Sequence, residues 1–385
     1  MPRKSEGNSA TAATAQSNRP AASARHLQTL RNQIDKLDLQ LLKLINERAS
    51  LAAEIGRYKN DAGEEVFSPQ REEEVLQTVV QVNDKHNGPL EASSIRAIYR
   101  EIVSASRALQ KVLRIAYLGP EYSYSHLAAI ERFGQTIEYL PTGSIAAVFE
   151  EVVRGHVDFG VVPLENSTDG RVADTLDMFL RLRSQEPEVW ICSEVRLPIH
   201  HHLLANCEPQ EIRRVYSKAQ AISQCRNWLS KNLPHASLHV VSSTADAARL
   251  AQQEPGAAAV ASEQAAARYG LRVLFSNIED YPNNETRFAV IGRQKSGKTG
   301  HDKTAIMFRV PHSPGALVDA LDVFKQARIN LTWIESFPAK TEKPEYIFFA
   351  DFEGHIEEPK VARALKALGE HCHEVTVLGS FPMAQ

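Results

Sequence analysis

The sequence is poor in cysteine, in net charge and in long apolar runs, and each shortage excludes a class of protein. Its 385 residues include only four cysteines, which are Cys192, Cys207, Cys225 and Cys372. Because none are spaced as CxxC, we expect reduced core thiols rather than disulfides or a zinc site. A net charge of -3 with mixed signs gives no argument for nucleic acid or a membrane surface as partner. No apolar run reaches the roughly 18 residues of a membrane span, so we expect a cytoplasmic protein of two or three domains.

The start of the chain lacks the composition of a folded domain. Residues 1–24 are mostly Ser, Ala, Thr and Asn with scattered Arg, which predicts a disordered tail. The segment shows neither the amphipathic Arg face nor the apolar stretch of a targeting peptide.

What the sequence does have is one long helical pattern from about Leu27 to Lys59. Alternate steps of three and four residues predict a coiled-coil seam, formed by Leu27, Leu30, Ile34, Leu37, Leu41, Leu44, Leu51, Ile55 and Tyr58. Arg48 interrupts this seam, and a guanidinium there requires an anion opposite. The anion is either a carboxylate of a partner helix or a small ligand.

Helix geometry favours the ligand. Lys59 lies on nearly the same helix face as Arg48, roughly 16 Å further along, so two long cations can lean toward one anion. Arg31 is about 25 Å from Arg48 on another face, and a straight helix cannot bring both to one ligand. If all three serve one site, Arg31 must come from a second copy of the chain.

Two further helices are predicted before residue 111. Ser68-Pro69 is a cap residue followed by proline at the first helical position, and Arg71 and Glu72 follow in the first turn. A third helix from Glu91 to Lys111 ends in the polar residues Ser106 and Gln110. Solvated helix ends would explain these polar residues equally well.

Together these segments resemble the all-helical chorismate mutase domain, over residues 25–111. The resemblance rests on LR…ER…K in the first helix, PxRE in the second and SxxxQ in the third. It assigns the pocket to Arg31, Arg48, Lys59, Arg71, Glu72, Ser106 and Gln110, with Ser68 where relatives often have aspartate. It also implies an intertwined homodimer. Chorismate has two carboxylates and rearranges by a pericyclic step, so forked cations that hold the reactive conformer suit it. Lys59 and Gln110 would stabilise charge on the ether oxygen, and Glu72 would bind the hydroxyl.

Residues 113–292 alternate short apolar strands with helices, which predicts a parallel-sheet α/β domain. Strands are expected at 114–119, 136–140 and 158–164. A weak repeat relates 141–166 to 241–264, because both run from a polar cap through an Ala-rich helix to an apolar strand. It predicts two lobes with a ligand cleft between them, a periplasmic-binding-like layout that proteins without catalytic activity also use.

Three segments at strand ends resemble the signatures of prephenate dehydratase: GPEYSYSH (119–126), ENST (165–168) and NETRF (284–288). The resemblance implies that Thr286 is the reactive threonine, and that Ser123, Asn166, Ser167, Thr168, Gln220, Arg287 and Phe288 bind substrate. Because threonine is a weak acid, we expect a hydroxyl relay from Ser123 or Thr168 to Thr286. Arg287 is a candidate anchor for a carboxylate, although a structural role is as well supported. Two residues depart from the family pattern: Tyr122 replaces a usual glycine and Lys218 a frequent histidine.

Two segments imitate cofactor motifs. GRQKSGKT (292–299) fits the P-loop pattern, but no helix is predicted after it, so residues 293–302 are interpreted as a basic linker. The run His200-His201-His202 precedes an apolar strand, and it suits strand packing better than a metal site.

Residues 303–385 show a βαββαβ order, which predicts an α+β ferredoxin-like domain. With PGAL (314–317) and ESFP (335–338), this part resembles the amino-acid-sensing ACT domain. The resemblance implies that phenylalanine is the effector, bound near Gly315, Ala316, Leu317, Asn330, Glu335 and Ser336. Phe337 replaces the usual arginine, and a dimerisation module without sensing is the alternative.

The resemblances imply a bifunctional enzyme that converts chorismate through prephenate to phenylpyruvate without metal or cofactor, as a homodimer or tetramer. Two alternatives remain open at this point. One is a prephenate dehydratase with a merely structural helical domain, and the other is a non-catalytic bilobal sensor of a small ligand.

Overall fold

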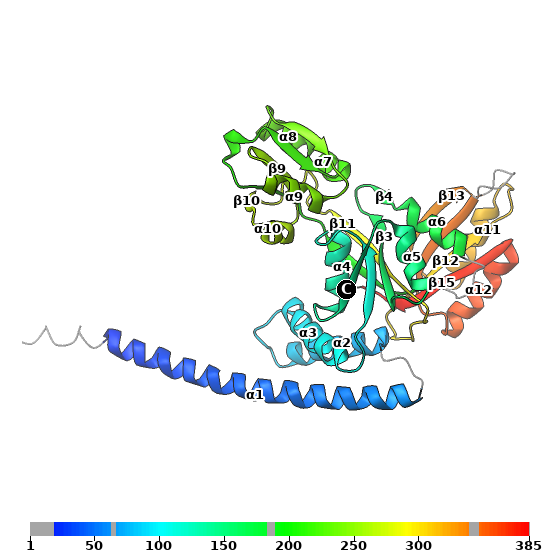
Figure 1. The fold of residues 1–385 in the computed structure, drawn as a ribbon. Helices are drawn as coiled ribbons and strands as arrows, with labels where there is room; N and C mark the ends of the chain where they lie inside the picture. Colours follow the sequence, from blue (N-terminus) through cyan, green and yellow to red (C-terminus); the bar gives the residue numbers. More distant parts are fainter. Residues whose placement is uncertain (1–18, 63–66, 183–188, 339–345, 385) are drawn as a thin grey trace, which may run out of the picture.

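The computed structural model describes residues 19–62 (side chains from residue 25), 67–182, 189–338 and 346–384. They form a helical region, a two-lobed α/β region and a C-terminal α+β region, which follow one another along the chain (Figure 1). In the described ranges, no helix is both long and apolar enough to cross a bilayer.

The helical region contains α1 (Arg19–Ala62), α2 (Pro69–Lys85) and α3 (Ala92–Ala108). α2 begins as predicted, because the Ser68 hydroxyl accepts a hydrogen bond from the Arg71 amide at 3.2 Å and Pro69 occupies the first turn. The predicted tail, in contrast, extends too far. α1 already begins at Arg19, since this stretch is rich in alanine and Pro20 falls in the first turn, where proline is tolerated. Residues 1–18 lie outside the described part.

α1 has one covered face and one bare face. It contacts α3, and its partly or fully buried positions are Ile45, Arg48, Ala49, Ala52, Ala53, Gly56 and Lys59. Gly56 permits this close contact, because an added Cβ would lie 2.6 Å from the Cγ of Gln110. The apolar seam residues are 43–69% exposed, and much of α1 extends past the rest of the chain (Figure 1). A single chain therefore leaves the predicted seam uncovered.

The first lobe is built on a sheet of order β2-β1-β3-β11-β5, with β4 paired to β3. Its strands are β1 (Arg114–Leu118), β2 (Glu138–Thr142), β3 (Phe159–Asn166), β4 (Gly170–Arg171), β5 (Trp190–Pro198) and β11 (Glu285–Gly292). Its helices are α4 (Tyr124–Phe133), α5 (Ile145–Val153) and α6 (Ala173–Leu182). The prediction of a parallel sheet is only partly right. β1, β2 and β3 are parallel, but β11 is antiparallel to β3 and β5, because it returns from the second lobe and enters from the opposite end.

The second lobe has the sheet order β10-β6-β9-β7-β8. Its strands are β6 (His202–Ala205), β7 (Arg214–Ser217), β8 (Ser237–Val240), β9 (Ala257–Ala261) and β10 (Arg272–Phe275). Its helices are η1 (Pro209–Glu211), α7 (Ala219–Gln224), α8 (Arg226–Asn232), α9 (Thr244–Gln253) and α10 (Glu263–Tyr269). The predicted repeat is present, because α5 leads into β3 beside parallel β1 as α9 leads into β9 beside parallel β7. β5 leads out of the first lobe and β11 leads back, so these strands form the hinge (Figure 1).

The C-terminal region has the predicted βαββαβ order. It comprises β12 (Asp302–Arg309), α11 (Ala316–Gln326), β13 (Leu331–Pro338), β14 (Tyr346–Glu353), α12 (Pro359–His371) and β15 (Glu374–Pro382), with sheet order β13-β14-β12-β15. α11 and α12 cover one face. The other face, which includes Phe349 and Phe381, shares an apolar core with the first lobe. Gly379 lets β15 approach β5, because an added Cβ would collide with the Ile191 carbonyl oxygen. β11 ends at Gly292 and β12 begins at Asp302, so no helix follows the P-loop-like segment, as predicted.

Candidate active sites

A cavity of about 780 Å³ lies between the two lobes. Helices α4, α5 and α9 begin at its wall, capped by the hydroxyls of Ser123, Ser144 and Ser243. The N-terminus of a helix presents free N–H groups and a partial positive charge to anions. Lys218 adds a cation on the wall that belongs to the second lobe. The cleft is therefore suited to a small molecule that carries carboxylates.

Thr286 lies on β11 at the wall of this cleft. Asn166, at the end of β3, donates from Nδ2 to Thr286 Oγ1 at 2.8 Å and to Asn284 Oδ1 at 3.0 Å. Because the threonine oxygen accepts this hydrogen bond, its own proton is not used there and can be donated to a molecule in the cleft. Three residues from two of the sequence signatures thus meet at one point.

The expected hydroxyl relay to Thr286 is wrong. Ser123 Oγ donates to the Leu118 carbonyl at 2.9 Å and caps α4, while Thr168 Oγ1 donates to Asn166 Oδ1 at 2.6 Å. Both hydroxyls are used in local cap and turn bonds, which serine and threonine commonly make. The group that donates to Thr286 Oγ1 is the Asn166 amide, whereas a hydroxyl was expected there.

Some of the other residues predicted for this site line the cleft, and one connects segments beside it. Phe288 and Gln220 line the cavity. Ser167 instead ties two segments together, because its hydroxyl accepts from the Glu285 amide at 2.9 Å and donates to the Asn283 carbonyl at 3.2 Å.

Tyr122 adopts the backbone conformation that its unusual position requires. Its φ is 63°, in the left-handed region that glycine occupies without strain. The Tyr122 amide donates to His126 Nδ1 at 3.0 Å, so the loop keeps a defined shape despite the side chain.

Arg287 does not face the cleft, so its prediction as a substrate anchor is wrong. Only 3% of Arg287 is exposed. Its Nε donates to Glu194 Oε2 at 2.7 Å, and its Nη2 pairs with Asp351 of the C-terminal region. Lys303 Nζ also lies 3.1 Å from Glu194. Neighbouring residues of a strand point to opposite sides, and Thr286 and Phe288 on either side of Arg287 both line the cavity.

Sequence reasoning missed several polar residues of this cleft. Asp169, His201 and Gln224 all line the cavity. Asp169 directly follows the ENST segment, and His201 belongs to the histidine run that was assigned to strand packing. Gln224 lies in no recognisable motif. Among the residues that the structure describes, no group of His, Cys, Asp and Glu is placed to hold a metal ion.

The predicted helical site is partly assembled along the contact between α1 and α3. Arg48 Nη1 donates to Ser106 Oγ at 2.9 Å, and Gln110 packs against Gly56 two helical turns further along α1. Lys59 is partly buried beyond Gly56. Arg31 is exposed on the free part of α1, so one chain does not bring it to Arg48.

The remaining helical residues have other partners. Arg71 is exposed and pairs with Glu74 at 3.1 Å. Ser68 serves as the cap of α2.

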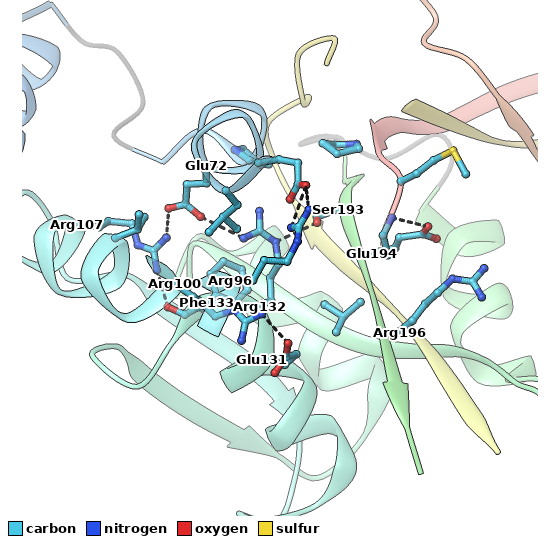
Figure 2. Close-up of a pocket in the computed structure, with 18 residues that line it drawn as sticks. Glu72, Arg96, Arg100, Arg107, Glu131, Arg132, Phe133, Ser193, Glu194 and Arg196 are labelled. Carbon is cyan, nitrogen blue, oxygen red and sulfur yellow. Dashed lines mark hydrogen bonds and ion pairs between the residues drawn. The ribbon is translucent and has the colours of Figure 1, made fainter. Parts of the chain in front are cut away.

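Glu72 faces the first lobe rather than Arg48 and Ser106. Figure 2 shows its carboxylate between Arg107 of α3 and Arg132 of α4, which lies 3.1 Å away. Arg132 Nε also donates to Ser193 Oγ at 3.1 Å, and Arg107 Nη2 donates to the Phe133 carbonyl at 2.7 Å. These groups surround a cavity of about 110 Å³ where the helical region meets the first lobe and the C-terminal segment. Two guanidinium groups satisfy the carboxylate, so in a single chain Glu72 contributes to the domain contact.

The residues predicted for the C-terminal module lie at two places. Gly315, with φ of 87°, precedes α11, where Ala316 and Leu317 help to line a cavity of about 210 Å³ together with Tyr346 and Phe348.

The second group lies on or beside β13. Glu335 accepts a hydrogen bond from the cleft residue Arg171 at 2.9 Å. Asn330 donates to Glu353 at 2.9 Å, and Ser336 is exposed. Phe337 is buried in the core shared with the first lobe, an apolar environment that explains the absence of arginine.

Comparison with known proteins covers both candidate sites. A family model described as chorismate mutase type II matches residues 30–111, and one described as prephenate dehydratase matches residues 115–296. The bifunctional chorismate mutase/prephenate dehydratase of Aquifex aeolicus is 45% identical over 360 residues, which cover 93% of this chain and 98% of that protein. Its counterpart in Stutzerimonas stutzeri is 44% identical over 368 residues, or 94% and 99% of the two chains.

A solved structure is similar over the dehydratase part. It is the prephenate dehydratase of Arthrobacter aurescens in complex with L-Phe, which is 32% identical with a TM-score of 0.65 and covers 71% of this chain and 90% of that chain. The chain therefore belongs to the family of bifunctional chorismate mutase/prephenate dehydratases, enzymes of phenylalanine biosynthesis, and it has both activities.

Proposed function

We propose that prephenate binds in the interlobe cleft and that Thr286 donates a hydrogen bond to the hydroxyl that leaves the ring. The observation that carries this proposal is the orientation of Thr286, whose oxygen accepts from Asn166 at 2.8 Å while its proton remains available. In the reaction the bond from the ring to one carboxylate breaks and releases carbon dioxide. The electron pair of this bond completes the aromatic ring, and the hydroxyl leaves as water after it takes up one proton, which comes in net from solvent. A fixed donor at that hydroxyl stabilises the charge that develops as it leaves.

The two carboxylates of prephenate are assigned to different groups than the signatures imply. Arg287 is paired with Glu194 and Asp351, so it has no role in this assignment. The side-chain carboxylate is assigned to the N-termini of α5 and α9 and to Lys218, which all lie at the cleft wall. The departing carboxylate is assigned to the apolar part of the wall. Removal of water from around a carboxylate destabilises its charge and so favours its loss as carbon dioxide.

Chorismate is assigned to a pocket formed by α1, α2 and α3 together with α1 of a second chain. Arg48 and the partner's Arg31 hold the two carboxylates, and Lys59 and Gln110 donate to the ether oxygen. The exposed apolar stripe of α1 supports an intertwined homodimer, because a contiguous uncovered apolar surface of this kind indicates a protein interface. Arg71 and Ser106 line this pocket. Glu72 is assigned to the substrate hydroxyl, for which its carboxylate must turn away from Arg132.

Mixing two inactive variants tests whether the pocket is shared. Arg31→Ala and Arg48→Ala should each abolish most mutase activity as homodimers. A mixed dimer has one doubly altered site and one intact site, so refolding an equal mixture should restore about a quarter of the wild-type activity. The measurement is chorismate consumption after joint refolding, with the two variants refolded separately as the control. A mixture no more active than its components would show that each pocket uses one chain.

The C-terminal region is proposed to be an ACT domain of ferredoxin-like fold that senses phenylalanine. The cavity at the start of α11 combines helix N–H groups, suited to a carboxylate, with the aromatic rings of Tyr346 and Phe348. The Arthrobacter aurescens relative was solved with L-Phe. The Arg171–Glu335 pair, at 2.9 Å, connects β13 to the cleft, and bound phenylalanine can act only by favouring one arrangement of these parts.

One assay tests the regulated two-step function. Chorismate is given to the purified full chain, and prephenate and phenylpyruvate are followed with and without phenylalanine. We expect both products in sequence, with phenylalanine lowering phenylpyruvate formation within the roughly 5–150-fold range of typical coupling. Glu335→Gln should still bind phenylalanine in calorimetry but show weaker inhibition. A phenylpyruvate rate that ignores phenylalanine would refute the sensing role.

A further inference from the structure

A second large cavity lies behind the hinge, on the side away from the interlobe cleft. Its volume is about 690 Å³, within the range of small-molecule sites. Successive residues of an extended segment point to opposite sides, and in the segment that joins the lobes Ile199 and His201 line the cleft whereas His200 and His202 line the second cavity. We call this space the hinge cavity. Its ring-bearing wall residues are Tyr122, Tyr124, His126, Tyr139, His200 and His202.

Two buried imidazole rings present N–H groups that are not used within the protein. His126 and His202 are only 7% and 9% exposed. The Nδ1 of His126 accepts from the Tyr122 amide at 3.0 Å, and the Nδ1 of His202 accepts from the Asn277 amide at 3.3 Å. Burial lowers the pKa of both rings, so each ring is neutral and carries its proton on Nε2. In the described ranges, neither Nε2–H has a hydrogen-bond partner, which leaves two donors for an oxygen of a bound molecule.

The remainder of the wall is mostly aromatic and aliphatic. The rings of Tyr122 and Tyr139 lie edge-on to His126, with centroids 5.6 and 5.3 Å away. Leu127 of α4 and Leu197 of β5 also line the cavity. Aromatic rings prefer such offset or edge-on neighbours, so the wall suits a molecule that contains a ring.

The charge of the hinge cavity is negative. Of the residues that the structure describes, no lysine or arginine lines it, whereas Glu131 and Glu263 do. Glu131 is paired with Arg100 at 2.7 Å. Glu263 is exposed in the first turn of α10 and has no ion pair with another described residue. An ammonium group is therefore favoured here, both by the Glu263 carboxylate and by the faces of the tyrosine rings.

This preference is the reverse of that of the other two ligand cavities. The interlobe cleft has Lys218 and helix N-termini at its wall, and the cavity at α11 also has a helix N-terminus, so both suit carboxylates. We propose that the hinge cavity is a further ligand site, which binds a small aromatic amine that also carries an oxygen acceptor for the imidazole N–H groups. The ring packs against the tyrosines, and the ammonium group lies toward Glu263.

Tyramine is a suitable probe, because it combines a ring, an ammonium group and a phenol oxygen but has no carboxylate. It is titrated into the full-length protein in a calorimeter without substrate, and we expect one saturable site per chain. Two analogues each remove one contact. Tyrosol has a hydroxyl in place of the amine and should bind about two- to fivefold more weakly. Phenethylamine lacks the phenol oxygen and should bind about two- to tenfold more weakly.

Two variants remove the same contacts from the protein. Glu263→Gln should weaken tyramine about two- to fivefold and leave tyrosol unchanged. His202→Asn keeps an acceptor for the Asn277 amide but is too short to donate into the cavity, so it should weaken tyramine about two- to tenfold and leave phenethylamine unchanged. The matched control is His239→Asn on exposed β8, which should bind all three molecules normally. Each thermal midpoint reports on folding.

A molecule in the hinge cavity touches both lobes, so its binding is coupled to their relative position. Because the joining segment lies between the two spaces, a rotation about it that narrows the cleft widens the hinge cavity. An occupant therefore favours the closed cleft. Saturating tyramine should lower the KM for prephenate by at least about fivefold in the wild type and less in His202→Asn. This second measurement rests on the prephenate site proposed above.

The outcomes separate the site from its coupling. Absence of saturable tyramine binding would overturn the proposal. So would equal losses from His202→Asn for tyramine and phenethylamine together with equal losses from Glu263→Gln for tyramine and tyrosol, because the predicted contacts would then not exist. Binding as expected with an unchanged KM would reject only the coupling. The calorimetry contains no prephenate, so its result is independent of the role of Thr286.

Discussion

Replacement of Thr286 by alanine is expected to lower dehydratase turnover about 100- to 1000-fold, the effect of removing one donor from a preorganised site. Alanine keeps only the Cβ atom, so no hydroxyl remains to donate to the leaving hydroxyl. The Asn166 amide, 2.8 Å from Thr286 Oγ1 in the wild type, would lose one acceptor, but its bonds to Asn284 and to the backbone amides of the loop after β3 would keep it in place. The measurement is phenylpyruvate formation from prephenate under single-turnover conditions, which separates the chemical step from product release.

Two controls sharpen this result. Thr286→Ser keeps the hydroxyl and should retain turnover within about tenfold, since only the rotamer preference set by the β-branch is lost. Mutase activity of both variants should equal the wild type, because Thr286 lies on β11 of the first lobe, outside the helical region. A Thr286→Ala enzyme with near-normal dehydration would mean that the leaving hydroxyl takes its hydrogen bond from another group.

Replacement of Arg287 by alanine is expected to destabilise the protein by about 3–5 kcal/mol, the usual effect of removing one partner from a buried ion pair. Glu194 and Asp351 would both lose their guanidinium partner in a region that water does not reach. The loss should appear as a lower thermal midpoint of the dehydratase part. Arg287→Lys keeps the charge but not the forked donors of the guanidinium. Its thermal midpoint should lie between those of the alanine variant and the wild type.

The stability of the Arg287→Ala variant should also depend on pH. Burial raises the pKa of Asp351 even with Arg287 and Lys303 opposing it, and loss of Arg287 raises it further. A carboxyl whose pKa is raised in the folded state stabilises the fold when protonated and loses this contribution as the pH rises. The deficit of the variant should therefore be smaller at pH 5 than at pH 8.

Arg196→Ala is the matched control for this experiment. Arg196 lies on β5, is well exposed and pairs with Glu285 at 2.8 Å. Its replacement should therefore lower the free energy of unfolding by less than about 1 kcal/mol. If Arg287→Ala instead melted like the wild type and raised KM for prephenate, Arg287 would be a substrate anchor after all.

Local signals in the sequence explain most of the fold and part of the dehydratase site. The cap Ser68, the alternation of strands and helices and the repeat between 141–166 and 241–264 all depend on neighbouring residues, and each appears where it was predicted. The predicted end of the N-terminal tail was wrong, because an alanine-rich segment is compatible both with disorder and with a helix. The prediction of a parallel sheet failed at β11, because the direction of this strand depends on the path of the chain through the second lobe.

Side-chain direction was harder to predict than location. Arg287 sits between two cleft residues on a strand, and alternation alone would have placed it on the opposite face. Glu72 differs, because its direction depends on Arg132 of α4, some sixty positions away along the chain. Gln224 belongs to no motif, and it gains its partners Thr168 and Asp169 only because the two lobes approach each other.

The apolar core shared by the first lobe and the C-terminal sheet bears on how this enzyme can change over evolution. Loss of the region after residue 302 by recombination would uncover part of the apolar core that first-lobe residues such as Phe149 and Leu176 now share with Phe349 and Phe381. A lineage that discarded the C-terminal region in this way would have to resurface the dehydratase at the same time. The helical region meets the first lobe through ion pairs such as Arg132–Glu72 and places one described residue, Phe67, in an apolar core of that lobe, so its separation would uncover less apolar surface. Gain and loss of the mutase are therefore open to a single genetic event, whereas the C-terminal region and the dehydratase are expected to be inherited together.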